Sequence, residues 1–171
     1  MAVTSPTRRS GCQAAVMRGL VQRVTRAEVR SRASLDDRWE TSGSIGAGLC
    51  VLVGVTHDDQ VATADKLANK IWGLRILDDA GGVMNRSLSD IHADGVAEVL
   101  VVSQFTLYGD TRKGRRPSWV DAARPDHAEV LVDRVVESLQ SLGATVATGV
   151  FRTEMEVDLT NDGPVTLMLE V

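Results

Sequence analysis

The 171-residue sequence is poor in the residues that form covalent cross-links and metal sites. It has two cysteines, Cys12 and Cys50, which lie far apart, one near the N-terminus and one in an apolar run. A disulfide framework is therefore not expected. The three histidines never stand four residues apart and no two cysteines are close, so the spacing of a metal site is absent. We expect a protein without a metal ion.

The sequence also lacks a long hydrophobic run. The longest candidate, residues 49–55, is much shorter than the ~20 apolar residues that cross a bilayer. Residues 1–16 include Arg8 and Arg9, but the apolar stretch of a secretory signal does not follow them. These absences predict no membrane partner and a cytoplasmic location. Residues 1–16 are expected to form a disordered extension, or to precede a start of translation at Met17.

Neither a repeat nor a linker divides the rest of the chain, so residues 17–171 are predicted to form one domain. The formal net charge is −4, yet residues 112–116 alone carry four positive charges, so the difference leaves −8 for the remainder. This asymmetry favours a local contact with a polyanion. A protein that coats nucleic acid is not expected, because most of the surface would repel phosphate, and no DNA partner is predicted.

Hydrophobic periodicity predicts a mixed α/β chain. Residues 17–24 and 27–30 are expected to form the two strands of a hairpin, joined tightly at Thr25 and Arg26. Some of the other segments are wholly or mostly apolar, which is the pattern of strands covered on both faces. Others follow the helical period, and the last two segments alternate with period two. They predict strands at 49–53 and 96–102, turns at 35–38 and 78–82, a helix from Asp59 to about Leu77 capped by Thr56, a helix from Asp126 to Gly143, and closing strands at 145–150, 154–160 and 165–171.

A hydrolase usually shows a nucleophile with its base, and no such pair is convincing here. His57 and His127 stand near helix starts and His92 in a polar loop, so each is interpreted as a surface residue. Cys50 is interpreted as a core residue. Hydrolysis by this chain would therefore rely on oriented hydrogen-bond donors and a held water, which suffice for an activated ester.

Two short segments stand out against this background. Residues 103–107, Ser-Gln-Phe-Thr-Leu, follow a buried strand, and backbone N–H groups around Gln104 and Phe105 are candidate donors to an oxyanion. The ordinary alternative is a strand with Phe105 and Leu107 packed inward. Residues 161–166, Asn-Asp-Gly-Pro-Val-Thr, place a Gly-Pro dipeptide where a strand begins, so a cis bond and an ordinary trans turn are both open.

Together and in this order, the two segments resemble the paired signature motifs of the D-aminoacyl-tRNA deacylases, which hydrolyse the ester between a D-amino acid and the 3′ end of tRNA. The resemblance runs from about residue 17 to 171 and includes Gln-Arg-Val at 22–24, Gly-Val-Thr-His-Asp-Asp at 54–59 and Met-Asn at 84–85. It implies one α/β domain with a β-barrel-like sheet and two main helices. It also implies a homodimer that binds the aminoacylated end of tRNA and needs no cofactor.

The resemblance assigns the first segment to a pocket. Ser103, Gln104, Phe105 and Thr106 would line the site of the terminal adenosine and the aminoacyl group. Thr106 matches a threonine proposed in the family as a nucleophile, with assistance by the substrate's own 2′-hydroxyl as the alternative. We rank the 2′-hydroxyl first, because no base for Thr106 is visible in the sequence.

The resemblance assigns the second segment to chiral selection. The Gly163-Pro164 dipeptide would be cis and would enter the pocket of the other subunit, where its carbonyl oxygens meet the substrate's α-amino group and no room remains for an L side chain. Glycine, lacking a side chain, would escape this exclusion. Asn161 belongs to the same motif, Arg23 matches an arginine that holds the Gly-Pro loop, and Met155 matches a pocket methionine. A surface arginine and a core methionine are the ordinary alternatives for the last two.

A basic loop follows the first segment directly. Arg112, Lys113, Arg115 and Arg116 are expected to contact acceptor-stem phosphates, with a merely solvated loop as the alternative. Trp119 stands where the family commonly has phenylalanine, a conservative difference. Two other functions stay open: a non-catalytic module that binds tRNA or DNA, and a general esterase. The preferred amino acid and tRNA are not predicted.

Overall fold

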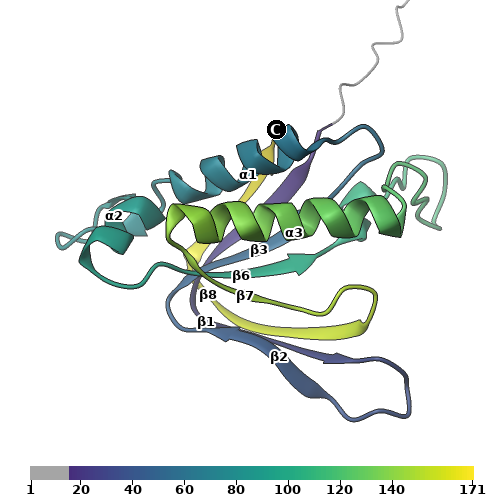
Figure 1. The fold of residues 1–171 in the computed structure, drawn as a ribbon, viewed down its shortest axis with the longest axis horizontal. Coiled ribbons are helices and arrows are strands. Elements are labelled where there is room, and N and C mark those ends of the chain that lie inside the picture. The colour runs from purple at the N-terminus through teal and green to yellow at the C-terminus, as the bar shows by residue number, and fades with distance from the viewer. Residues whose placement is uncertain (1–15) are drawn as a thin grey trace, which may run out of the picture.

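The computed structural model describes residues 16–171 (Figure 1). The extension expected at residues 1–16 therefore lies outside the described residues except for Val16. In chain order the elements are β1 (Arg18–Arg32), β2 (Glu40–Ile45), β3 (Gly48–Gly54), α1 (Val61–Trp72), β4 (Leu77–Asp78), β5 (Met84–Arg86), α2 (Leu88–Asp94), β6 (Glu98–Ser103), the 3₁₀ helix η1 (Phe105–Tyr108), α3 (Pro125–Leu142), β7 (Thr145–Thr148) and β8 (Glu154–Glu170). None of the helices in this part of the chain is long and apolar enough to cross a membrane.

Strand β1 is the element to which most of the sheet is attached. Its first half pairs antiparallel with β3 and its second half with β2, while β8 pairs along its whole length on the other side. The prediction of two strands joined at Thr25 and Arg26 was wrong. The strand continues through these residues because neither is a turn former and β8 supplies partners on both sides of them. The chain reverses later, in the turn predicted at 35–38, where the Asp37 carboxylate accepts the Ser34 N–H at 2.8 Å.

Strands β3 and β6 are parallel neighbours at the centre of the sheet, and both faces are covered, as their apolar sequences predicted. Alternate side chains enter two separate cores. Val51 and Val99 pack beneath α1 and α3, whereas Cys50 and Leu100 pack inside the curve of the sheet. Cys50 is therefore a core residue, as predicted, and burial raises the pKa of its thiol to about 11.

The sheet curls until its two edges approach each other, which makes it barrel-like (Figure 1). The approaching edges are β2 and β7, the two ends of the strand order β2-β1-β3-β6-β7. A Cβ atom on Gly43 would lie 2.6 Å from the carbonyl oxygen of Thr148, so this contact requires glycine. The predicted β-barrel-like sheet is confirmed. Strand β8 pairs only with β1 among the described strands and so leaves one edge open.

The two main helices lie side by side across one face of the sheet (Figure 1). Arg134 of α3 pairs with the Asp65 carboxylate of α1 at 2.7 Å, and the Ser138 hydroxyl donates to the same carboxylate at 2.6 Å. Both helices were predicted, but with different ends. Helix α1 begins at Val61, two residues after the predicted start at Asp59. It stops at Trp72, five residues before the predicted end, because Gly73 ends it.

The start of α3 also differs slightly from the prediction. The helix begins at Pro125, a residue suited to the first turn because its missing N–H is not needed there. It ends at Gly143, as predicted, with a left-handed φ of 112°. Helix α2 and the short strands β4 and β5 were missed, and His92 lies in α2 rather than in a loop. These short elements are too brief for periodicity to reveal.

Candidate active site

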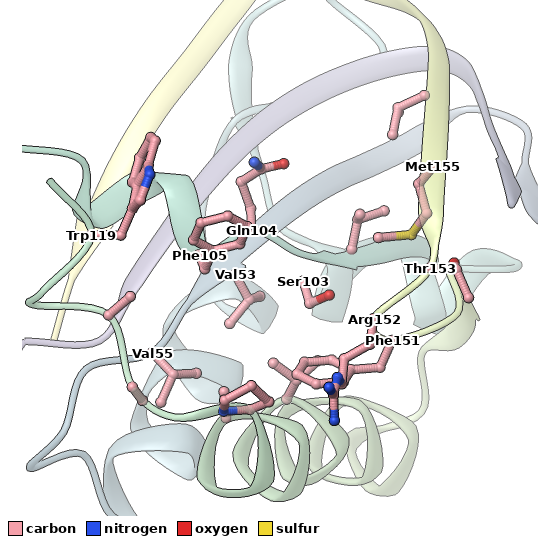
Figure 2. A pocket seen from close by; sticks show the side chains of 17 residues that line it. Val53, Val55, Ser103, Gln104, Phe105, Trp119, Phe151, Arg152, Thr153 and Met155 are labelled. Atoms are coloured by element: carbon pink, nitrogen blue, oxygen red, sulfur yellow. The ribbon is translucent and has the colours of Figure 1, made fainter. Parts of the chain in front are cut away.

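A cavity of about 680 Å³ opens where β3 and β6 end (Figure 2). Its walls come from these strand ends, the start of η1, the segment before α3, the first turns of α3, and the turn that joins β7 to β8. The floor is apolar and includes Val53, Val102 and Val132. Its volume falls in the usual range of small-molecule sites, roughly 300–1,000 Å³. The polar lining groups belong to Ser103, Gln104, Arg152 and Thr153.

The first sequence segment forms one wall of this cavity. Ser103 is the last residue of β6, opposite Val53 of β3, and the chain then turns into η1. The Gln104 N–H donates to the Val53 carbonyl at 2.7 Å, so it is not a free donor, contrary to our expectation. The Phe105 N–H begins η1 and finds no acceptor within residues 16–171. It remains the candidate oxyanion donor of this segment.

Thr106 stands apart from the cavity lining. Its side chain is exposed, and its hydroxyl accepts a hydrogen bond from the Gln104 side-chain amide. No histidine, aspartate or glutamate of the described chain bonds to this hydroxyl. The 17 lining residues of the cavity likewise include none of these three types. The structure thus brings Ser103, Gln104 and Phe105 together in the pocket, and leaves Thr106 at its edge without a base.

The two histidines nearest the cavity have structural partners. His57 Nε2 lies 2.7 Å from the Val120 carbonyl oxygen, and His127 Nε2 lies 3.0 Å from that of Asp59. Thr56 adds a bond from its hydroxyl to the Asp121 carbonyl at 2.6 Å. These contacts fasten the turn before α1 to the segment that carries Trp119 and leads into α3. The histidines therefore support a wall of the cavity, which the sequence did not indicate.

An aromatic pair marks the rim. Phe105 and Trp119 meet edge to face, with ring centroids 5.4 Å apart and planes at 75°. Both stay substantially exposed, at 58% and 41%. A Cβ atom on Gly109 would lie 2.6 Å from the Trp119 ring, so glycine is needed for this packing. Exposed aromatic faces beside this cavity suit the stacking of a nucleobase.

The second sequence segment is a bulge within β8 rather than the start of a new strand. Asn161 pairs with Val24 of β1 and Thr166 pairs with Gln22, so four residues of β8 stand opposite Arg23 alone. The strands predicted at 154–160 and 165–171 are thus one strand. The Asn161 side-chain amide donates to the carbonyls of Arg23 and Val165, both at 2.9 Å, and replaces ladder bonds that the bulge removes.

Arg23 anchors the bulge from below. Its side chain is about 10% exposed, and its Nη1 donates to the Ile76 carbonyl at 3.0 Å and to the Asp78 carboxylate at 2.8 Å. Its Nε lies 2.9 Å from the Asp162 carboxylate, an ion-pair contact that is not aligned as a hydrogen bond. The arginine is therefore buried, not a surface residue, and it contacts both the Asp78 segment and the bulge.

Gly163 occupies a position that other residues rarely tolerate. Its φ of 113° is left-handed, and a Cβ atom would lie 2.7 Å from Val165 Cγ2 and 3.1 Å from Arg23 Nη2. The Gly163–Pro164 bond is cis, and both residues are exposed. Neither lines the cavity of its own chain. The strand register separates Gly163 from Ser103 by three strand spacings, about 14 Å, in the direction perpendicular to the strands. It also separates them by four residues, about 13 Å, along the strand direction.

The basic loop is closed by a pair of backbone hydrogen bonds between Asp110 and Ser118, both 2.9 Å. Arg112 forms two side-chain bonds to Asp110, at 2.9 and 2.8 Å, and this pairing lowers the pKa of the carboxyl to about 2. Lys113, Arg115 and Arg116 are exposed and form no ion pair with the rest of the described chain. Arg112 thus shapes the loop, while the other three cations are available to a ligand.

Comparison with known proteins gives the family. The family described as D-Tyr-tRNA(Tyr) deacylase matches residues 20–170. The chain belongs to this family. Proteins named D-aminoacyl-tRNA deacylase from Streptomyces coelicolor and Mycolicibacterium smegmatis are 56% and 54% identical to it, over 156 and 158 residues. Each match covers 91% of this chain and 100% of the relative.

Solved structures give the same fold. The c-Myc DNA Unwinding Element Binding Protein superposes with a TM-score of 0.79 at 34% identity, covering 90% of this chain and 98% of that one. A probable eukaryotic D-amino acid tRNA deacylase superposes with a TM-score of 0.73 at 16% identity, covering 91% and 100%. At 16% identity the second likeness concerns the fold alone. The predicted deacylase-like fold is confirmed.

Other residues of this family member complete the pocket. Met155 lines the cavity from β8 and also packs against the core inside the curve of the sheet. Phe151 and Arg152, from the turn before β8, also line the cavity and were missed. Nothing in the local sequence Gly-Val-Phe-Arg-Thr marks these two, since no glycine or asparagine occupies the turn position itself.

Proposed function

We propose that this protein hydrolyses the ester bond between a D-amino acid and the 3′ end of tRNA, releasing the free amino acid and the tRNA. The observation that carries the proposal is the open cavity at the end of β6, one wall of which is formed by Ser103, Gln104 and Phe105 of the family's first motif. The protein is thus an ester hydrolase. It acts where aminoacylated tRNA is present, in the cytoplasm, and requires no cofactor of its own.

The reaction requires mainly that a water molecule and a hydrogen-bond donor are held in the correct orientation around the ester carbonyl. A water oxygen adds to the ester carbonyl carbon, the bond to the ribose oxygen breaks, and the proton passes to that ribose oxygen. The Phe105 N–H stabilises the oxyanion that develops on the carbonyl. The substrate's 2′-hydroxyl orients the water, since the lining of the cavity offers no basic side chain. Thr106 contributes no nucleophile in this scheme.

The tRNA end is held at two places. The terminal base stacks against the Phe105 and Trp119 rim, whose rings remain exposed. Lys113, Arg115 and Arg116 contact acceptor-stem phosphates without reading sequence. Arg112 takes part mainly by shaping the loop through Asp110.

The functional unit is a homodimer, in which the Gly163-Pro164 bulge of one subunit completes the cavity of the other. Two observations support this. The bulge is exposed, anchored by Arg23, and distant from the cavity of its own chain. The strand that carries it also presents an open edge with Leu167 and Met168, which are 39% and 47% exposed. Rejection of L-amino acids by this rigid element would leave glycine accepted, because glycine has no side chain to exclude.

Side-by-side deacylation of D-Tyr-tRNA, L-Tyr-tRNA and Gly-tRNA tests the activity. We expect release of D-tyrosine and glycine and retention of L-tyrosine. Binding of tRNA without release of D-tyrosine would favour a non-catalytic tRNA-binding module. Rapid cleavage of simple aryl esters together with L-Tyr-tRNA would favour a general esterase.

Mixed dimers test the shared site. One subunit carries Gly163→Val and the other carries a Gln104 substitution that disrupts the pocket and inactivates the homodimer. If the site is shared, both lesions fall in one pocket and the other pocket stays intact, so about half of the activity per dimer survives. Inactive mixed dimers that assemble and fold normally would place both motifs in one chain.

A further inference from the structure

Arg152 has a backbone conformation that arginine rarely adopts. It stands in the turn between β7 and β8, where the Thr153 N–H and hydroxyl both donate to the Val150 carbonyl, at 3.4 and 2.8 Å. Its φ is 61°, and among residues 16–171 it is the one non-glycine residue with a positive φ. Glycine or asparagine is the favoured residue at such a turn position. An arginine at a position that favours glycine or asparagine indicates that the arginine side chain itself has a role.

The side chain lies on the wall of the active-site cavity. Figure 2 shows it on the turn that faces the strand-end wall carrying Ser103 and Gln104. Every other residue that lines the cavity is uncharged. The Arg152 guanidinium also forms no hydrogen bond or ion pair with the described chain, whereas Arg18 and Arg30 each pair with a carboxylate within 3.0 Å. An unpaired cation thus borders an otherwise neutral pocket.

A neighbouring groove limits where an anion can bind. It shares Ser103, Val132 and Phe151 with the cavity and is bordered by the acidic residues 129, 133 and 137 of α3. These carboxylates repel a phosphate on that side. An anion attracted by Arg152 is therefore directed to the cavity side of the turn.

We propose that Arg152 binds the phosphate that joins the terminal nucleotide of the tRNA to the rest of its acceptor end. The proposal rests on the proposed function, because that function places an aminoacylated nucleoside in the cavity. The group nearest to such a nucleoside that carries a full negative charge is its own 5′ phosphate. The guanidinium fork matches two phosphate oxygens with parallel hydrogen bonds.

The test compares two RNA hairpins that mimic the acceptor end. Both carry D-tyrosine at the 3′ end, and they differ in the last linkage, which is a phosphodiester in one and an uncharged methylphosphonate in the other. For Arg152→Gly we expect the KM of the phosphodiester hairpin to rise about tenfold, the effect of losing one charge-assisted contact, with kcat retained. The KM of the methylphosphonate hairpin should not change. Arg152→Lys should recover part of the affinity, because it keeps the charge.

Two controls separate this role from a structural one. Arg152→Gly should unfold at the same or a higher temperature than the unaltered protein, because glycine accepts the positive φ. Glu129→Gln should leave the KM of the phosphodiester hairpin unchanged or lower it. A rise in KM with Glu129→Gln that matches Arg152→Gly would instead assign Arg152 to an internal ion pair and overturn the proposal.

Binding of non-hydrolysable 3′-amide versions of both hairpins gives the same comparison without turnover. A tenfold loss of affinity confined to the phosphodiester version supports the role of Arg152, even if hydrolysis fails and the proposed function is wrong. Equal affinity of the two versions for the unaltered protein, or an equal loss with both on Arg152→Gly, rejects the role while leaving the hydrolase function intact.

Discussion

The two signature segments of this chain are built in opposite ways. Residues 103–105 stand at the end of a buried strand and line an open cavity, with Thr106 at its edge, and within the described chain they have one free backbone donor and no ion pair. Residues 161–166 do not line this cavity, and they are held by the nearly buried Arg23 and by the Asn161 side-chain amide. The first segment offers space to a ligand, and the second offers a rigid shape.

In the proposed function, this difference divides specificity between the two segments. A cavity with an apolar floor and few polar groups tolerates many aminoacyl side chains. A rigid bulge that is anchored on both sides can reject a wrong configuration, because it cannot move aside. We therefore expect changes in the bulge and its anchors to have larger effects than changes in the pocket wall.

Loss of the buried anchor should have the largest effect. Arg23→Met leaves the carboxylates of Asp78 and Asp162 without their shared cation, and we expect a loss of about 3 kcal/mol of unfolding free energy in urea. Deacylation of D-Tyr-tRNA should fall more than about a hundredfold at a temperature where the variant is folded, because the whole bulge loses its anchor. The matched control is Arg26→Met, which breaks an exposed pair with Asp158 on the same two strands and should cost about 1 kcal/mol or less. Equal costs for the two variants would refute the anchoring role.

The next largest effect is expected at the tip of the bulge. Gly163→Ala adds a Cβ atom 2.7 Å from Val165 Cγ2 at a φ of 113°, so the bulge must shift. We expect about a hundredfold loss of deacylation, since small misplacement of positioning groups has effects of this size. Gly82→Ala is the control for the φ effect alone, because Gly82 has a φ of 74° with no atom within 4 Å. It should cost about 1–2 kcal/mol and leave kcat unchanged.

The pocket wall should be more tolerant. Thr106→Ala removes a hydroxyl that contacts only the Gln104 amide, so we expect the rate of D-Tyr-tRNA hydrolysis to stay within about fivefold of the unaltered protein. Single-turnover rates at saturating enzyme measure this directly. Complete inactivation with intact tRNA binding would restore Thr106 as the nucleophile. Substitutions in the two segments would then have equally large effects on activity.

The basic loop should give the smallest effect. Lys113→Gln removes a cation that has no ion-pair partner in the described chain. The negative slope of log K for tRNA binding against log salt concentration should become shallower by about 0.7–0.9. Arg112→Gln should change this slope less, because Arg112 is paired with Asp110. Chiral preference should be unaffected in both. An unchanged slope for Lys113→Gln would mean that the loop does not contact phosphate.

The predicted parts of the fold are those with a local signal. Residues 49–53 are apolar throughout and residues 96–102 are apolar except for Glu98, and this pattern identified the two central strands. Hydrophobic periodicity predicted the helices that end at Gly73 and Gly143, although the predicted end of the first helix lay five residues too late. The break at Thr25 and Arg26 was wrong, because pairing with β8 decides the course of β1 and that partner lies more than a hundred residues away.

The sequence by itself determined the two central strands, the two main helices and the position of both signature segments, because periodicity and glycine placement act over a few residues. Only the tertiary structure decided that Arg23 is buried between Asp78 and Asp162, and that Gly163 stays away from the cavity of its own chain. It also decided that Arg152 adopts a left-handed φ on the wall of the cavity. These outcomes depend on contacts between residues distant in sequence, whose free energies no local pattern contains.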